Sequence, residues 1–222
     1  MVYYDIHTHR QALRVEDIAI VSLDARDRGK VAAMFSADEN PSEYYTVGVH
    51  PWYAGEQLMD VVYEYAALRS VVAIGETGLD KTTAKTSDVF MLQQALFAEH
   101  VRLSEELKKP LIVHCVKAWD ELLHIRKVLK PSMPWIIHGF RGNELLATQL
   151  LNAGFYLSFG KLYNAKALKV AWEKRRLLAE TDDSGADIRD IYRRLAEVLN
   201  ISEIELSAEI EDFFNTKLLT LS

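Results

Sequence analysis

Eight short apolar runs, most of them followed by a longer helical pattern, constrain the fold of this 222-residue chain more than any other feature. The runs show little polar alternation, which is typical of strands that are covered on both faces. Strands that alternate with helices in this way predict a parallel sheet, and eight of them predict an α/β protein with a (β/α)₈ TIM barrel. The runs span residues 2–6, 18–23, 45–49, 71–74, 111–113, 135–137, 155–159 and 177–179.

Helical signals lie between many of these runs. Residues 56–69 place Leu58, Val61, Val62, Tyr65 and Leu68 on one helical face. Further helices are predicted from Ser87 as N-cap to Lys108, from Asn143 as N-cap to Gly154 at C′, and from Ser202, where Ser202 and Glu205 have capping-box spacing. The segment between His9 and Ile18 is too short for a crossover helix. We therefore expect a compact, distorted barrel with an abbreviated first β–β connection.

The composition limits the class of protein. Hydrophobic residues make up 49% and charged residues 26% of the chain, values that favour one globular domain over residues 1–222 and argue against disorder. Cys115 is the single cysteine, which fits a reducing, cytoplasmic location. No apolar run is long enough to cross a bilayer. The formal net charge is −6, whereas proteins that bind nucleic acid through a broad basic surface usually have a positive net charge. We therefore expect any polyanionic substrate to be held by a few local cations or by metal.

Residues with metal-ligand side chains recur where the predicted strands end. His7 and His9 are two positions apart, so in a strand their imidazoles point to the same side. In a barrel, the C-terminal ends of all strands open on one face, where active sites are built. The other residues in equivalent positions are His50, Glu76, His114, His138 and Asp182.

A mixed set of imidazoles and carboxylates suits Zn²⁺, Mn²⁺ or a similar ion, and a carboxylate can bridge two such ions. Any single histidine beside a strand is more often a hydrogen-bonded structural residue than a metal ligand. For His50, the structural role and the ligand role stay open as equal alternatives. His100 and His124 lie in helical patterns without a partner, and we interpret both as non-functional. The six residues other than His50, at the ends of five strands, together favour a metal site over packing.

Six motifs carry a family resemblance. They are Asp5-Ile6-His7-Thr8-His9, Gly48-Val49-His50-Pro51, Ile74-Gly75-Glu76-Thr77-Gly78-Leu79-Asp80, Leu111-Ile112-Val113-His114, Ile137-His138-Gly139-Phe140 and Leu178-Ala179-Glu180-Thr181-Asp182. In this order, the set resembles the TatD-type metal-dependent hydrolases of the amidohydrolase-like barrel group. The resemblance spans residues 2 to about 182 and extends to the segment that contains Gln93 and Phe97.

The resemblance implies a distorted TIM barrel, one or two divalent metal ions (Zn, Mn or Mg), and hydrolysis of DNA phosphodiester bonds, typically from the 3′ end. By motif, His7 and His9 bind the first metal, Glu76 bridges two metals, and His114 and His138 complete the second. Asp182 binds metal and orients or deprotonates the attacking water. His50 contacts the substrate phosphate, so the resemblance gives catalytic roles to Asp182, Glu76 and His50.

The sequence departs from the family pattern in two places, the short first connection and the segment after Asp182. There, Asp183-Ser184-Gly185 leads almost directly into a helix near Ala186, so we expect reduced substrate-binding walls. Five basic residues follow strand ends and are candidates for contacting phosphate: Arg10, Lys81, Lys117, Arg141 and Lys161. Trp52 and Tyr53 follow His50 and suit either stacking of a terminal base or packing in the core or a loop.

The expected substrate is therefore single-stranded DNA, an oligonucleotide or a small phosphodiester, with no membrane and no obligate protein partner. Asp5 is a candidate partner for a ligand histidine, because such histidines need a group that fixes their tautomer. One alternative is a metal-dependent amidohydrolase or lactonase that acts on a small molecule. Many such barrels carry a carbamylated lysine as the bridging ligand, whereas here Glu76 has that place. A binding protein that kept the barrel and a metal-free structural barrel are weaker alternatives, since no ligand residue is missing.

Overall fold

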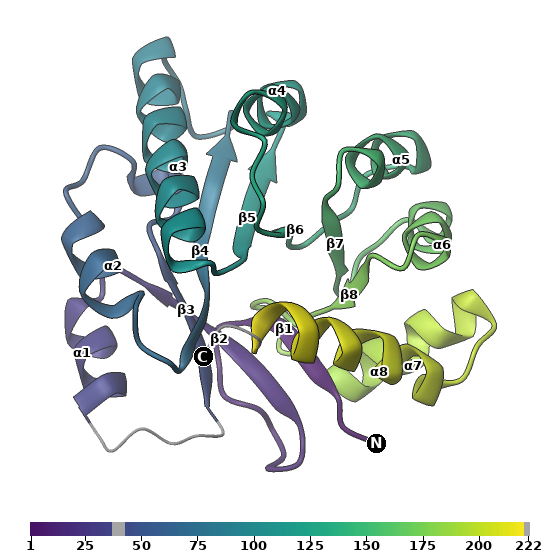
Figure 1. The fold of residues 1–222 in the computed structure, drawn as a ribbon. Coiled ribbons are helices and arrows are strands. Elements are labelled where there is room, and N and C mark those ends of the chain that lie inside the picture. Colours follow the sequence, from purple (N-terminus) through teal and green to yellow (C-terminus); the bar gives the residue numbers. More distant parts are fainter. Residues whose placement is uncertain (37–42, 220–222) are drawn as a thin grey trace. The chain divides into compact units, whose positions relative to one another are not determined.

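The computed structural model of the chain describes residues 1–36 and 43–219. Within these residues, β2 follows β1 without an intervening helix, and helices separate the remaining strands (Figure 1). The strands are β1 (Tyr4–Thr8), β2 (Ile18–Asp24), β3 (Tyr44–Gly48), β4 (Val71–Asp80), β5 (Leu111–Val116), β6 (Trp135–Ile137), β7 (Tyr156–Phe159) and β8 (Leu177–Ala179). The helices are α1 (Arg28–Ser36), η1 (Pro51–Tyr53), α2 (Met59–Tyr65), α3 (Ser87–Leu107), α4 (Trp119–Leu129), α5 (Glu144–Asn152), α6 (Ala165–Glu173), α7 (Ile188–Leu199), α8 (Glu203–Phe213) and η2 (Phe214–Leu218). Each of the eight predicted apolar runs overlaps a strand.

The strands form one sheet in the order in which they occur along the chain. The pairs β1–β2, β3–β4, β4–β5, β6–β7 and β7–β8 run parallel. A further parallel bridge links Thr8, at the end of β1, to Asp182, just after β8. A parallel sheet whose last strand is linked to its first has the connectivity of a (β/α)₈ barrel, so the predicted fold class is confirmed.

The chain divides into two compact units. The first unit contains residues 1–21 and continues from residue 136 to the end of the described chain, and so includes β1, β7, β8 and α5 to α8. The second unit contains residues 22–135, with β3, β4, β5 and α1 to α4. The expected organisation of residues 1–222 as a single domain stays a prediction.

In the first unit, β1 is fixed by helices from the end of the chain. The buried hydroxyl of Tyr192 in α7 donates to the Tyr4 carbonyl oxygen at 3.1 Å and accepts from the Tyr4 amide at 3.2 Å. The hydroxyl of Ser207 in α8 donates to the Val2 carbonyl at 2.6 Å. Ser202 and Glu205 form the predicted capping box that begins α8. These contacts hold the strand that carries His7.

In the second unit, α3 packs along β4 and its buried Phe97 ring meets Trp135 edge-to-face at 5.0 Å. Strands β4 and β5 approach closely at Gly78, which has a φ of +145°. A Cβ atom at this position would lie 2.0 Å from the His114 carbonyl oxygen. Only glycine therefore allows β4 to run beside the part of β5 that carries His114.

Two predicted helix boundaries differ from the structure, and two other local predictions are confirmed. Thr86, not Ser87, is the N-cap of α3, because the Thr86 hydroxyl accepts from the Val89 amide in an extended backbone conformation. The helix predicted over 56–69 is limited to Met59–Tyr65, since η1 and the turn at Gly55 occupy the preceding residues and Leu58 offers no side-chain cap. Asn143 caps α5 as predicted, and residues 9–17 contain no helix, as expected for the first connection.

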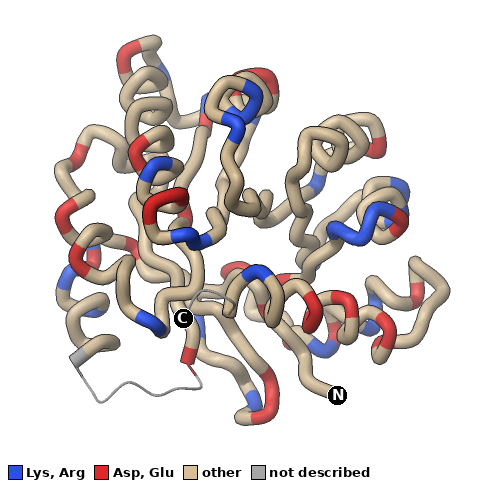
Figure 2. Tube along the Cα trace, in the orientation of Figure 1, with Lys and Arg blue, Asp and Glu red and all other residues tan. Residues whose placement is uncertain are grey.

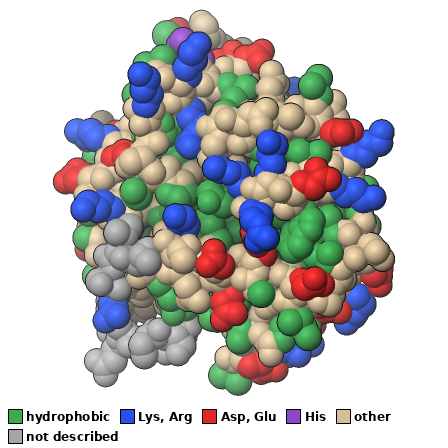
Figure 3. Space-filling model, turned by 45° about the vertical axis from the view of Figure 1, so that its right-hand side comes forward, with side chains coloured by type: hydrophobic (Ala, Val, Ile, Leu, Met, Phe, Trp, Pro, Cys, Tyr) green, Lys and Arg blue, Asp and Glu red, His purple; other side chains and the backbone are tan. Residues whose placement is uncertain are grey.

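Charge is distributed in small groups. Figure 2 shows basic positions on α6 and at its C-terminal end. On the face shown in Figure 3, basic and acidic side chains are interspersed with apolar ones. This face carries no broad basic surface, in keeping with the net charge of −6. Within the described part of the chain, no helix combines the length and the apolar character that crossing a bilayer requires.

Candidate metal centre

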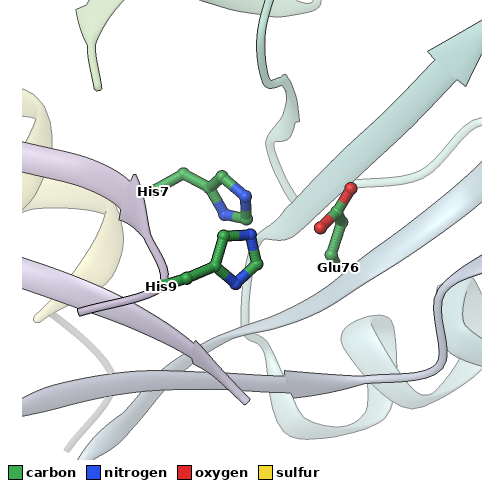
Figure 4. A group of neighbouring side chains, drawn as sticks. All are labelled: His7, His9 and Glu76. Carbon is green, nitrogen blue, oxygen red and sulfur yellow. The ribbon is translucent and has the colours of Figure 1, made fainter. Parts of the chain in front are cut away.

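The first unit brings together His7, His9, His138 and Asp182. His7 is fully buried near the end of β1, whereas His9 follows the strand and its side chain is 45% exposed. Figure 4 shows both imidazole rings, which lie 5.2 Å apart between centroids. One Asp182 carboxylate oxygen, Oδ1, lies 3.4 Å from His9 Nε2 and 3.7 Å from His7 Nε2. The ring of His138 lies 4.3 Å from that of His7.

The position of Asp182 follows from the bridge between β1 and the end of β8. The Asp182 amide donates to the His7 carbonyl oxygen at 3.0 Å, and the Thr8 hydroxyl donates to the Asp182 carbonyl at 3.4 Å. Asp182 has a φ of +53°, a left-handed conformation that aspartate tolerates better than most residues. This turn directs its carboxylate to the two imidazoles of the first unit.

Asp5 supports the same turn through the backbone. Its buried carboxylate accepts from the Thr181 amide at 2.9 Å and from the Thr181 hydroxyl at 2.5 Å. Burial raises the pKa of Asp5 to about 7, although the hydrogen bonds from Thr181 act in the opposite direction. The sequence predicts that Asp5 contacts a ligand imidazole, whereas its carboxylate contacts Thr181 and the backbone of His7. It positions the segment that carries Asp182.

Glu180 is a site residue that sequence reasoning passed over. Its fully buried carboxylate accepts from the Gly139 amide at 2.6 Å, and the same oxygen lies 3.6 Å from His138 Nδ1. Carboxylates beside ligand imidazoles orient the ring in many metal sites. The signal available in the sequence was its spacing, two residues before Asp182.

The second unit brings together His50, Glu76 and His114. Glu76 lies in β4 (Figure 4), with one carboxylate oxygen 3.0 Å from His114 Nδ1 and 3.3 Å from His50 Nε2. The His50 and His114 rings lie 4.4 Å apart. His50 follows β3 and lies immediately before η1, as predicted, whereas His114 lies within β5, which continues to Val116.

Asp80, at the end of β4, is a second acidic residue that sequence reasoning passed over. It is 2% exposed, and its Oδ2 lies 3.5 Å from His114 Nε2 and accepts from the Trp52 indole N–H at 2.7 Å. Burial alone would raise the pKa of Asp80, but hydrogen bonds from Thr82 and Trp52 outweigh it and lower the pKa. An ionised Asp80 therefore lies beside Nε2 of His114, while Nδ1 of the same ring lies beside Glu76.

His100 has a clear structural role. It is fully buried in α3, with Nδ1 2.8 Å from the Leu96 carbonyl oxygen and Nε2 accepting from the Val49 amide at 3.1 Å. Burial lowers its pKa to about 4, so the ring is neutral at physiological pH. The expectation that His100 has no partner was wrong, because it fixes the backbone beside His50. His124 is exposed on α4.

The five basic candidates differ in their surroundings. Arg10 donates to the Ala186 carbonyl oxygen, and Lys81 forms an ion pair with Glu121 at 2.6 Å. Lys117, Arg141 and Lys161 are exposed and form no ion pair within the described residues. The structure therefore leaves these last three more available for an anion than Arg10 and Lys81.

The donor atoms in both clusters are spaced for a metal ion. Ligands bound about 2.1 Å from one tetrahedral ion lie about 3.4 Å from each other. The nitrogen–oxygen distances in the two clusters run from 3.0 to 3.7 Å. In each of the triads His7–His138–Asp182 and His50–Glu76–His114, the potential ligand atoms all lie within 4.8 Å of one another. Imidazole nitrogens and carboxylate oxygens thus fit a divalent cation in either unit.

Comparison with known proteins settles the family. Residues 5–217 match the family model described as TatD related DNase. The chain belongs to this family. The motif resemblance is thereby confirmed over nearly the whole sequence.

Curated relatives of this TatD-family chain carry mostly general names. An "uncharacterized metal-dependent hydrolase" of Buchnera aphidicola is 35% identical over 64% of this chain and 57% of its own length. The protein YcfH of Escherichia coli, with the same description, is 30% identical over 79% of this chain and 74% of its own. A "3′-5′ ssDNA/RNA exonuclease TatD" of Klebsiella pneumoniae is 29% identical over 68% of this chain and 61% of its own length. The match thus spans little more than half the length of some relatives.

Two solved structures share the fold of this TatD-family chain. YjjV, a TatD homologue from Escherichia coli, superposes with a TM-score of 0.79 at 20% identity and covers 97% of both chains. A TatD family hydrolase from Entamoeba histolytica superposes with a TM-score of 0.75 at 20% identity and covers 98% of both. At this level of identity, the likeness shows the barrel fold alone.

Proposed function

We propose that this chain is a divalent-metal-dependent phosphodiesterase that removes nucleotides from the 3′ end of single-stranded DNA or short oligonucleotides. The observation that carries the proposal is the spacing of imidazole and carboxylate donors in the clusters around Asp182 and Glu76. The name of the Klebsiella relative, a 3′-5′ ssDNA/RNA exonuclease, supports nucleic acid as the substrate class.

In this proposal, His7, His9, His138 and Asp182 are metal ligands of the first unit, and Glu76 and His114 are metal ligands of the second. The bridging role of Glu76 stays a prediction, as do the number of ions, one or two, and the choice among Zn, Mn and Mg. When bound, divalent cations activate water and neutralise charge on the phosphoryl oxygens. His50 contributes the contact to the substrate phosphate.

Asp182 is the proposed general base. Its side chain is 24% exposed, which gives water access, and its backbone is fixed by the His7 carbonyl and by Thr8. A carboxylate held in this way can accept a proton from water and aim the resulting nucleophile at phosphorus. Asp5, through Thr181, and Glu180, through Gly139, keep the surrounding backbone in place.

Local cations complete the proposal. Lys117, Arg141 and Lys161 are the exposed candidates for binding phosphate oxygens, and Arg10 and Lys81 are weaker ones because each already has a partner. With so few phosphate contacts, the affinity for a single strand should depend only weakly on salt concentration. A plot of log affinity against log salt concentration should have a slope of about −0.7 for each phosphate contact. A reducing, cytoplasmic setting is part of the proposal, because Cys115 is the single cysteine.

A metal-dependent substrate screen tests the proposal. The protein is stripped with a chelator, reloaded with Zn²⁺, Mn²⁺ or Mg²⁺, and given single-stranded DNA, RNA, bis(p-nitrophenyl) phosphate and a set of lactones. We expect metal-dependent cleavage that shortens a 5′-labelled DNA strand one nucleotide at a time from its 3′ end. Lactone hydrolysis without phosphodiester cleavage would contradict the phosphodiesterase and favour the small-molecule alternative.

A further inference from the structure

Trp52 combines two properties that seldom occur together. The residue is 55% exposed, although large aromatic residues are usually buried to a greater extent. It is nevertheless held in place, because the indole N–H donates to the Asp80 carboxylate at 2.7 Å and the backbone amide donates to His50 Nδ1 at 3.3 Å. An exposed ring with a fixed orientation provides apolar contact area at little cost in side-chain entropy.

The group that anchors Trp52 is itself rigid. Asp80 is nearly fully buried, and its other carboxylate oxygen accepts from the Thr82 amide at 2.7 Å. The buried Gln93 side chain accepts from the Asp80 amide at 2.9 Å and donates to the Asp80 carbonyl at 3.2 Å. Since backbone and side chain of Asp80 are both fixed, the indole that it binds has a defined position relative to η1.

The neighbouring imidazoles leave the indole unstacked. The His50 ring lies 4.6 Å from the Trp52 ring at 78°, and the His114 ring lies 6.4 Å away at 79°. Both arrangements are edge-to-face, so neither imidazole lies parallel on the indole. Tyr53 differs, because the guanidinium of Arg26 lies 3.2 Å from its ring centroid and covers that ring.

We propose that Trp52 is the stacking platform for the base of the nucleotide whose phosphate is contacted by His50. This inference rests on the proposed phosphodiesterase function and names the part of the substrate, a nucleobase, that Trp52 recognises. A π-face accepts any base, so the platform favours a nucleotide over a simple phosphodiester without reading sequence. Purines stack more extensively than pyrimidines and should be the better terminal residues. Tyr53, already paired with Arg26, has no such role.

The experiment compares two single strands that differ only at the 3′-terminal nucleotide, which carries adenine in one and an abasic tetrahydrofuran in the other. The metal-loaded enzyme, Trp52→Ala, Trp52→Phe and Tyr53→Leu are assayed for kcat/KM on both strands, and circular dichroism checks that each variant is folded. Stacking of a base on an aromatic side chain corresponds to about 5- to 150-fold in affinity. We expect the wild type to prefer the adenine strand within this range.

Trp52→Ala should reduce the ratio of kcat/KM on the adenine strand to kcat/KM on the abasic strand to nearly one. Trp52→Phe should keep part of this preference, because phenylalanine retains a π-face but lacks the N–H that is bonded to Asp80. Tyr53→Leu should leave the preference unchanged. If Trp52→Ala lowers kcat/KM equally on both strands, Trp52 only braces Asp80 and the inference is overturned while the phosphodiesterase stands. If the wild type cleaves both strands equally well, the inference is likewise overturned. Failure of the wild type to cleave either strand would overturn the proposed function as well.

Discussion

The guanidinium of Arg14 lies 2.7 Å from the carboxylate of Asp187, and this ion pair joins the two helix-free segments that follow β1 and β8. Arg14 belongs to the short connection between β1 and β2, and Asp187 ends the short segment between β8 and α7. Arg10 also donates to the Ala186 carbonyl of the second segment, and Arg189, in the first turn of α7, binds Asp17 of the first segment at 2.9 Å. The two short segments therefore support each other through an ion pair and a hydrogen bond.

Asp187 has two separable functions at this junction, and substitutions should distinguish them. Its side chain accepts from the Arg189 amide as N-cap of α7, in addition to binding Arg14. Asp187→Ala removes both and should lower the free energy of unfolding by about 1–2 kcal/mol. Asp187→Ser keeps a capping oxygen and should lose less than half of that amount. Urea unfolding measures the free energy of unfolding of both variants. If Asp187→Ala and Asp187→Ser lose the same amount, the ion pair with Arg14, and not the N-cap, accounts for most of the stabilisation by Asp187.

His100 should make the second unit sensitive to acid. The native ring stays neutral down to about pH 4, whereas an unfolded histidine takes up a proton near pH 6.5. Between these values the unfolded chain binds the extra proton, so this contribution to stability is complete above pH 6.5 and is lost as the pH falls towards 4. The loss is up to about 3 kcal/mol.

The matched variant for this prediction is His100→Gln, whose amide can both donate to Leu96 and accept from Val49 but does not titrate in this range. Free energies of unfolding are measured from pH 8 to pH 4 for both proteins, and the difference between them isolates His100 from other titrating groups such as Asp5. We expect the wild type to lose stability relative to the variant on acidification. Parallel curves would show that His100 does not titrate on unfolding.

The strands were predictable because their burial leaves a direct mark on the sequence. Runs such as 71–74 and 111–113 are buried on both faces, and only apolar residues fit there. The cap at Asn143 and the capping box of Ser202 and Glu205 were also predictable, because each is complete within four residues. The N-cap of α3 was not, since Thr86 and Ser87 both carry a hydroxyl and only the backbone conformation decides between them.

The candidate ligands were predictable by motif, but the groups that position them were not. Glu180 and Asp80 acquire their roles from Gly139 and Trp52, which are distant in sequence, and no local pattern reveals such partners. His100 gave no signal for the same reason, because its partner Val49 lies 51 residues away. The place of Arg10 after β1 predicts a phosphate contact, whereas in the structure Arg10 donates to the Ala186 carbonyl of the neighbouring short segment.

Asp182→Asn tests the proposed base. Asparagine keeps the size and one oxygen of the side chain but does not accept a proton from water, so general-base catalysis is lost. We expect kcat on bis(p-nitrophenyl) phosphate to fall by about 10²- to 10⁴-fold, the usual contribution of such a group. The thermal midpoint should change little, because Asp182 is held mainly through its backbone. Full activity in the variant would exclude Asp182 as the base.

Metal binding should be visible as stability, independently of any substrate. A ligand that binds only the folded chain stabilises it by about 2.7 kcal/mol when present at 100 times its dissociation constant. We expect Zn²⁺ or Mn²⁺ to raise the thermal midpoint of the chelator-treated protein and His7→Ala to abolish much of this shift, because His7 is the fully buried imidazole of the first cluster. His124→Ala is the control, since its exposed side chain lies on α4 outside both clusters, and it should keep the full shift. An equal shift in wild type and His7→Ala would mean that the ion binds elsewhere, and the assignment of the first cluster as a metal site would then be wrong.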